Sequence, residues 1–323
     1  MKNSDLWTPP RGLLAELGER IKKYAEEYGV PVFPDLRNMD CITVASDYSG
    51  QEKSERFYVY SFLFADLTIT HSSDWYSSRL CWRRNFLPDG RRMTYKDLDH
   101  DQVRDRALSP YLSAVNTIDG MVVTIAIHKE VTSILELIPE KEQETFRSVK
   151  PEIREKMLWI IHFFGFFIAG LSRSGQSVWW CSDYDDIVAT DERISMMTQK
   201  LREIMSQYLP HRLGHLHVMT TARNPDDDPR RQRDLLLWYE DLVSIPDLVA
   251  GAFSDQLTTL KTKYALPTAG TTIDLPRTSL KNKTACILDW YVDSSQRLKR
   301  HAWVIMPSYP PPKCTIANLH VGV

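Results

Sequence analysis

The chain has 323 residues, of which 43% are hydrophobic and 25% are charged. This is ordinary globular composition, and the length predicts one large domain or two modest ones. The formal net charge of -2 excludes a global basic field for nucleic-acid binding but leaves room for a local basic patch.

The cysteine pattern and the apolar segments indicate the compartment. Five scattered cysteines stand at Cys41, Cys81, Cys181, Cys286 and Cys314. Their odd number and the lack of CxxC spacing argue against a disulfide framework and a cysteine-type zinc site. Residues 1–10 lack the apolar segment of a signal peptide. The most apolar window, 157–171, is about 15 residues long and therefore too short for a comfortable membrane span. We expect a cytoplasmic protein that does not enter a membrane.

The first predicted element is a helix from Pro10 to about Tyr28, where apolar residues recur at helical spacing. Gly29 is expected to close this helix, and a proline-containing extended linker follows. Residues 1–36 are therefore predicted to form a leading helix and a linker.

Strands dominate the next part of the chain. The stretches 41–47 and 57–64 are apolar and separated by a short charged turn, which predicts an antiparallel hairpin. A third strand is predicted within 78–86, followed by a helix over 99–115. The almost continuous apolar run 120–128 is typical of a central strand that is covered on both faces.

Helices and strands then alternate up to residue 265. The predicted helices are 131–138, 151–171, 191–208 and 235–260, the last with a break expected at Pro246, and the predicted strands are 177–181 and 214–220. An antiparallel meander followed by this alternation predicts an α/β fold over residues 37–265, with a mixed sheet and helices on both faces.

The C-terminal part of the chain changes character. A turn-rich linker over 268–278 precedes three predicted strands at 284–292, 297–306 and 315–321. We therefore predict a C-terminal β-rich appendage over residues 266–323.

Three aspartates stand where strands or helices would present them at a sheet edge. Asp47 ends the first strand, Asp183 follows a later strand, and Asp247 comes directly after Pro246, where a helix is expected to begin. Carboxylates that converge from separate elements repel one another unless a cation neutralises them. Hard oxygen ligands select Mg²⁺ or Mn²⁺, and such ions can activate water for attack on a phosphodiester. The alternative is that each aspartate only caps a helix or a turn.

Two short motifs resemble those of a known group of proteins. The sequence Asp-Tyr-Ser-Gly stands at 47–50, and Pro-Asp-Leu-Val-Ala-Gly stands at 246–251. They are similar to the Asp-Glu-Ser-Gly and Ala-Asp-Leu-Ile-Ala-Gly motifs of a group of bacterial proteins in the ribonuclease H-like superfamily. The similarity extends over residues 41–262 and implies a ribonuclease H-like fold.

The resemblance also implies a metal site. Asp47 and Asp247 would be metal-binding, catalytic carboxylates of a nuclease-like centre, and Asp183 would be a third by its position. Asp185 is a further metal-ligand candidate, and Asp241 a secondary one. The chain departs from the group at one position, since Tyr48 replaces the glutamate.

A segment rich in arginine and tryptophan is the strongest nucleic-acid feature in the sequence. Arginine pairs with phosphate, and aromatic rings stack on bases. The alternative is a strand with its aromatic rings buried and its arginines in water. The candidate nucleic-acid-binding residues are Arg79, Trp82, Arg83, Arg84, Arg91 and Arg92.

Two functional hypotheses follow from the sequence. The first is a Mg²⁺- or Mn²⁺-dependent nuclease or phosphodiesterase, a hydrolase that acts on DNA or RNA. The second is a catalytically inactive ribonuclease H-like subunit that binds a protein partner in a multi-protein system, such as a defence system. Tyr48 and the near-neutral charge favour the second hypothesis.

Overall fold

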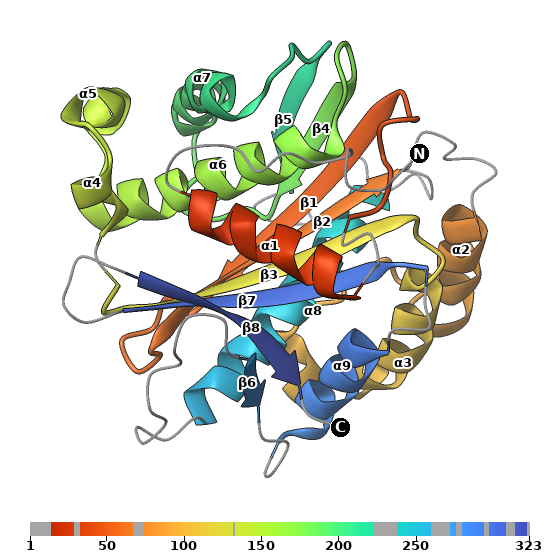
Figure 1. Cartoon of the computed structure of the whole chain (residues 1–323). Helices are drawn as coiled ribbons and strands as arrows, with labels where there is room; N and C mark the ends of the chain where they lie inside the picture. The colour runs from red at the N-terminus through yellow and green to blue at the C-terminus, as the bar shows by residue number, and fades with distance from the viewer. Residues whose placement is uncertain are drawn as a thin grey trace.

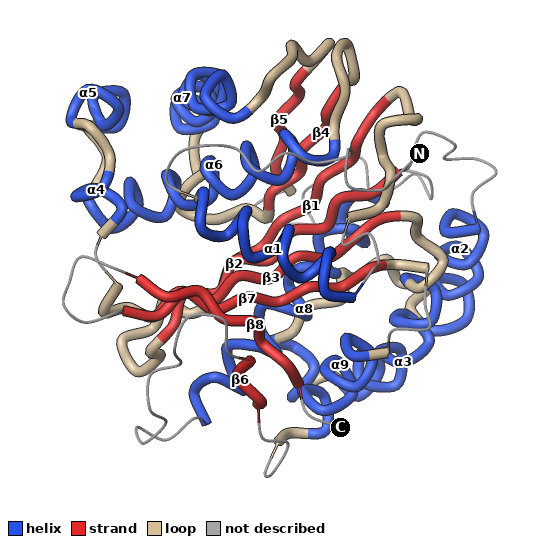
Figure 2. Tube along the Cα trace, viewed as in Figure 1, coloured by secondary structure: helices blue, strands red, loops and turns tan. Residues whose placement is uncertain are grey.

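The computed structural model describes residues 14–28, 33–66, 74–131, 133–221, 238–259, 272–275, 280–293, 297–307 and 314–321. They form a mixed eight-stranded sheet with helices on both faces (Figures 1 and 2). The strands are β1 (Cys41–Ser49), β2 (Phe57–Asp66), β3 (Gly120–His128), β4 (Ser177–Ser182), β5 (Leu216–Thr220), β6 (Thr272–Leu275), β7 (Lys299–Pro307) and β8 (Cys314–Val321). The longer helices are α1 (Ala15–Tyr28), α2 (Asp74–Phe86), α3 (Gln102–Val115), α6 (Pro151–Leu171), α7 (Asp191–Tyr208), α8 (Trp238–Thr259) and α9 (Asn282–Val292).

The strand order is β5-β4-β1-β2-β3-β7-β8-β6. Strand β2 is antiparallel to both β1 and β3, whereas β4 is parallel to β1 and β5 is parallel to β4. The described chain therefore has the predicted mixed α/β sheet with helices on both faces.

Each face of the sheet has its own hydrophobic core, because successive side chains of a strand point to opposite faces. In β2, Val59 and Leu63 pack with α2, α3, α8 and α9, while Tyr60, Phe62 and Phe64 pack with α1, α6 and α7. All residues of β3 are buried, as its continuous apolar sequence predicts. We call the two sides of the sheet the α8 face and the α6 face.

Helix α6 carries the most apolar stretch of the chain, and most of its residues from Met157 to Leu171 are buried against the sheet and α7. Among the helices that the structure describes, none combines the length and the apolar character that crossing a membrane requires.

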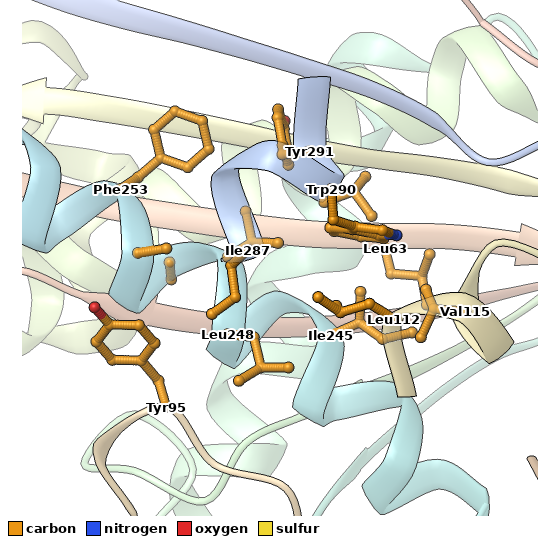
Figure 3. Packing of buried hydrophobic residues seen from close by; sticks show 14 of the residues in the cluster. Leu63, Tyr95, Leu112, Val115, Ile245, Leu248, Phe253, Ile287, Trp290 and Tyr291 are labelled. Atoms are coloured by element: carbon orange, nitrogen blue, oxygen red, sulfur yellow. The ribbon is translucent and has the colours of Figure 1, made fainter. Parts of the chain in front are cut away.

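The C-terminal strands continue the main sheet, because β7 pairs in parallel with β3 and β8 pairs with β7. Helix α9 adds to the core on the α8 face. Figure 3 shows Ile287 and Tyr291 of α9 beside Leu248 and Phe253 of α8. The strands predicted at 297–306 and 315–321 are confirmed.

Two predicted strands are wrong. Residues 78–86 belong to α2 and residues 284–292 belong to α9. In both helices the buried residues recur at helical spacing, as Thr284, Ile287, Leu288 and Tyr291 do in α9.

Three smaller corrections concern boundaries. Strand β6 lies within the predicted linker 268–278. Helix α8 runs through Pro246 without a break. The helix predicted at 131–138 is reduced to α4 (Ile134–Leu137), and the short helices α5 (Glu140–Gln143), η2 (Lys96–Asp99) and η3 (Glu144–Phe146) were not predicted.

Candidate functional site

Asp47, Asp183 and Asp247 line one cavity of about 600 Å³ on the α8 face. The cavity lies at the C-terminal ends of β1 and β4, and the loop after α2 forms another part of its wall. The structure therefore brings together three side chains that are far apart in the sequence.

Strand alternation and register place the first two carboxylates next to each other. Ala45 belongs to the core of the α8 face and Tyr48 to that of the α6 face, so Asp47 points to the α8 face. Ser46 lies opposite Ser182 in the parallel pair β1–β4. The Asp183 amide donates to the Ser46 carbonyl at 3.0 Å, which extends the ladder by one residue and sets Asp183 beside Asp47.

Asp247 reaches the cavity from the middle of α8, which packs across β1 and β2. The prediction that Asp247 lies in a first turn is wrong, because the helix continues on both sides of Pro246. The Asp247 carboxylate accepts a hydrogen bond from the Tyr95 amide at 2.8 Å. Gly251 permits this approach, since a Cβ atom there would lie 2.3 Å from the Tyr95 ring.

The three carboxyl groups are electrostatically coupled. Burial and the nearby charges of Asp247 and Asp183 raise the pKa of Asp47 well above its ordinary value. Burial also raises the pKa of Asp247, and Asp47 and Asp247 share a side-chain hydrogen bond. One proton held between two carboxyl groups is the expected response to like charges at close range.

Asp183 is paired with Arg92. Burial tends to raise the pKa of Asp183, but the Arg92 guanidinium, which donates to its Oδ1, holds this pKa below the ordinary value. The same oxygen accepts hydrogen bonds from the Thr221 hydroxyl at 2.6 Å and the Tyr184 amide at 2.9 Å. Burial lowers the pKa of Arg92, but the carboxylates of Asp183, Asp247 and Asp47 raise it above its ordinary value.

The cavity contains hard oxygen donors, which are the ligands that Mg²⁺ and Mn²⁺ prefer. Within the described residues, however, no group of three acidic, histidine or cysteine side chains is arranged closely enough to hold a metal ion as it stands. Arg92 lies among the carboxylates, and Asp183 is turned towards it.

Asp185 and Tyr48 also border the cavity, but both have structural partners. Asp185 forms an ion pair with Lys156 at 2.5 Å and accepts the Ile187 amide at 2.8 Å. Tyr48 is 7% exposed, and its hydroxyl is hydrogen-bonded to Ser46 Oγ at 2.6 Å. Tyr48 therefore belongs to the core of the α6 face. It has no carboxylate and adds no metal ligand to the cavity.

The structure contradicts a nucleic-acid role for Arg79, Trp82 and Arg83, since these side chains are buried. Both arginines form ion pairs with Asp241, whose side chain is fully buried. The helical spacing of Arg79 and Arg83 puts them on the same inward side of α2. Asp241 pairs with these arginines and does not line the cavity. The Trp82 indole N–H donates to the Ala107 carbonyl at 3.0 Å.

Three other predicted arginines have different surroundings. Arg84 is exposed on α2. Arg91 is 39% exposed and pairs with Asp89 and Asp101, and it lines the cavity together with the buried Arg92.

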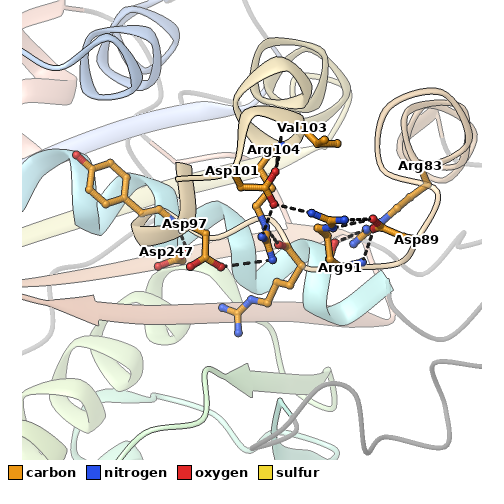
Figure 4. A network of polar contacts seen from close by, with 10 residues as sticks. Arg83, Asp89, Arg91, Asp97, Asp101, Val103, Arg104 and Asp247 are labelled. Atoms are coloured by element: carbon orange, nitrogen blue, oxygen red, sulfur yellow. Dashed lines mark hydrogen bonds and ion pairs between the residues drawn. The ribbon is translucent and has the colours of Figure 1, made fainter. Parts of the chain in front are cut away.

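The sequence analysis missed Lys96, Asp97 and Arg104, which also line the cavity. Arg104 binds Asp101 at 2.6 Å and Asp97 at 3.4 Å, so that the loop before α3 is tied to the start of this helix (Figure 4). The alternation of acidic and basic residues from 89 to 106 indicates a charge network, but no sequence pattern indicates that it faces the aspartates.

No protein-family model matches the chain, and no curated protein matches it. Among solved structures, the chain is similar to the one described as the structure of the PCNA:RNase HII complex from Archaeoglobus fulgidus. The TM-score is 0.30 and the sequence identity is 10%, over 70% of this chain and 83% of that chain. A likeness of this size gives no information about the activity of this chain.

Proposed function

We propose that this protein is a metal-dependent nuclease or phosphodiesterase that acts on nucleic acid at the cavity of Asp47, Asp183 and Asp247. The observation that carries the proposal is the meeting of these three carboxylates, from β1, the end of β4 and α8, in one cavity. Gathering like charges in a partly buried place is unfavourable unless a cation compensates them. Capping of helices or turns does not require the three side chains to lie in one cavity.

The residue types fit Mg²⁺ or Mn²⁺, with Asp47, Asp183 and Asp247 as the residues that would hold the ion. The raised pKa values of Asp47 and Asp247 reflect a repulsion that a divalent cation would relieve. When bound, the ion would supply an activated water and stabilise the developing charge on a leaving phosphodiester oxygen.

The basic side chains at the cavity would position the substrate. Arg91, Lys96 and Arg104 line it on the side of the loop after α2, where they can pair with phosphate oxygens. Aspartate partners of Arg91 and Arg104 offset much of this positive charge in the absence of substrate. Membership of the bacterial ribonuclease H-like group with the Asp-Glu-Ser-Gly motif is part of this proposal.

The test is cleavage of end-labelled single- and double-stranded DNA and RNA in Mn²⁺, in Mg²⁺ and in EDTA. We expect cleavage only with a divalent ion, and we expect Asp47→Asn to lower the rate by a factor of about 10³ or more. Asp191→Asn is the matched control, because Asp191 is exposed at the start of α7 and does not line the cavity. Wild-type rates in Asp47→Asn would contradict the proposal.

A specific observation favours a second candidate, a non-catalytic ribonuclease H-like subunit that binds a protein partner. The cavity lacks the glutamate of the related group, because Tyr48 is built into the opposite core, and it already contains a cation in Arg92. Such a subunit would show no cleavage of any labelled substrate and no change in melting temperature with Mn²⁺, in wild type and in every variant of the cavity.

A further inference from the structure

Arg92 lines the cavity together with the three carboxylates and pairs with Asp183. We propose that Arg92 is a built-in counter-cation that competes with divalent metal for Asp183 and so sets the metal affinity of the cavity. This inference rests on the proposed function and adds a regulatory residue to the same site.

The first argument is position. Arg92 is 8% exposed, and its Nη1 donates to Asp183 Oδ1. Its charge also acts on Asp47 and Asp247. A guanidinium and a divalent ion compete for the same carboxylate oxygen, and two cations at that range repel each other strongly in a poorly solvated place.

The second argument is that only some of the N–H donors of Arg92 have hydrogen-bond partners. In the part of the chain that the structure describes, its Nε and Nη2 are buried and have no hydrogen-bond partner. A guanidinium has five N–H donors, and donors that are buried without a partner are unfavourable. Charge, more than hydrogen bonding, therefore holds Arg92 in the cluster, and a competing cation has few hydrogen bonds to replace.

The third argument is that the backbone carrying Arg92 is fixed. The Arg92 carbonyl accepts from Arg104 Nε at 2.7 Å, and the Tyr95 amide is bound to Asp247. Farther along, Lys283 donates to the Tyr95 carbonyl at 2.9 Å. Exchange of Arg92 for a metal ion therefore needs a rotation of one side chain and no movement of the loop.

The test is titration of Mn²⁺ by calorimetry into wild type, Arg92→Met and Arg91→Met. Methionine keeps much of the length of the arginine stem and removes its charge. We expect Arg92→Met to bind Mn²⁺ at least about tenfold more tightly than wild type. Arg91→Met is the matched control, because Arg91 is the neighbouring pocket arginine but pairs with Asp89 and Asp101; we expect it to change the affinity less than about twofold.

Melting curves provide a second readout without activity. In EDTA, Arg92→Met should melt below wild type, because three carboxylates lose their counter-charge. Millimolar Mn²⁺ should raise its melting temperature more than that of wild type, and adding Asp47→Asn to this variant should remove the gain. Arg92→Gln, which keeps a donor for Asp183 without the charge, should behave in the same way.

The outcomes separate the inference from the proposed function. Equal Mn²⁺ affinity of wild type and both Arg92 variants would overturn the inference and leave the metal site standing. Absence of Mn²⁺ binding in all proteins would overturn both. If both Arg92 variants failed to fold even in Mn²⁺, a metal ion could not replace the guanidinium, and the inference would again be overturned.

Discussion

Helix α8 contributes an aspartate to each of two charge clusters on the same face of the sheet, and the two clusters are built differently. Asp241 lies between Arg79 and Arg83, with all three side chains buried. Six positions later in the sequence, Asp247 faces a cavity of about 600 Å³, where it is coupled to Asp47, Asp183 and Arg92.

The balance of charge separates the two clusters. In the first cluster, Asp241 pairs with two arginines, and the Tyr111 hydroxyl donates to the Asp241 carbonyl. The second has three carboxylates for one buried arginine, and it is open to a cavity. A closed cluster that supplies its own counter-charges holds helices together, whereas an open cluster with excess acid is suited to bind a cation from outside.

The largest expected effect comes from the closed cluster. Asp241→Asn would remove the ion-pair partner of two buried arginines, and breaking such a pair should lower the free energy of unfolding by about 3–5 kcal/mol. Urea denaturation measures this loss, and Mn²⁺ should not restore it. Asp89→Asn, at an exposed pair, is the control and should cost about 0–1 kcal/mol. A loss below about 1 kcal/mol for Asp241→Asn would remove the distinction between the clusters.

The free energy of unfolding should also depend on pH through a buried, neutral histidine on the α6 face. Burial lowers the pKa of His162 to about 4 from 6.5, and its Nδ1 lies 2.7 Å from the Tyr208 hydroxyl. Between these two pH values the unfolded chain binds a proton that the folded chain does not, so stability falls as the pH falls. The full loss is about 3 kcal/mol. Urea denaturation from pH 7 to 4 should show this loss in wild type, and it should be smaller in His162→Gln; parallel curves would contradict the assignment.

Gly251→Ala tests the contact that holds the cavity loop against α8. The added Cβ would collide with the Tyr95 ring, and overpacking of this kind costs about 1–3 kcal/mol. Because Tyr95 also binds Asp247, we expect slower cleavage as well. Gly175→Ala is not a suitable control, since Gly175 has a φ of +76°. Ser195→Ala, at an exposed position of α7, should leave stability and cleavage unchanged.

The smallest effect on stability is expected at the open cluster. Asp47→Asn should leave the melting temperature at pH 7 unchanged or slightly higher. Because the pKa of Asp47 is raised in the folded protein, this group lowers the free energy of unfolding as the pH rises above the ordinary pKa of an aspartate. Asparagine avoids this loss while keeping a hydrogen-bond donor. A drop of several degrees would show that Asp47 is structural.

Much of the fold could be predicted from the sequence where one physical pattern dominates. The continuous apolar run of β3 and the apolar helix α6 have only one good environment, the interior. The prediction failed for α2, where buried arginines at helical spacing looked like the exposed side of a strand. Their burial depends on Asp241, which lies far away in the sequence and whose proximity no local pattern reveals.

The candidate site could be predicted only in part for the same reason. Asp47 lies near the C-terminal end of β1 and Asp183 directly follows β4, and because these strands are parallel, this topology alone places both residues at one edge of the sheet. The role of Arg92 could not be predicted, because it depends on the path of the loop between α2 and α3. Tyr48 could have been assigned to the opposite face from strand alternation, since it follows Asp47 directly.

The most direct test of the central claim is an anomalous difference map from a crystal of wild-type protein soaked in Mn²⁺. We predict a manganese peak between the oxygens of Asp47, Asp183 and Asp247, with the Arg92 side chain moved away from Asp183. A map at saturating Mn²⁺ with no peak at these residues and with Arg92 still bound to Asp183 would contradict it.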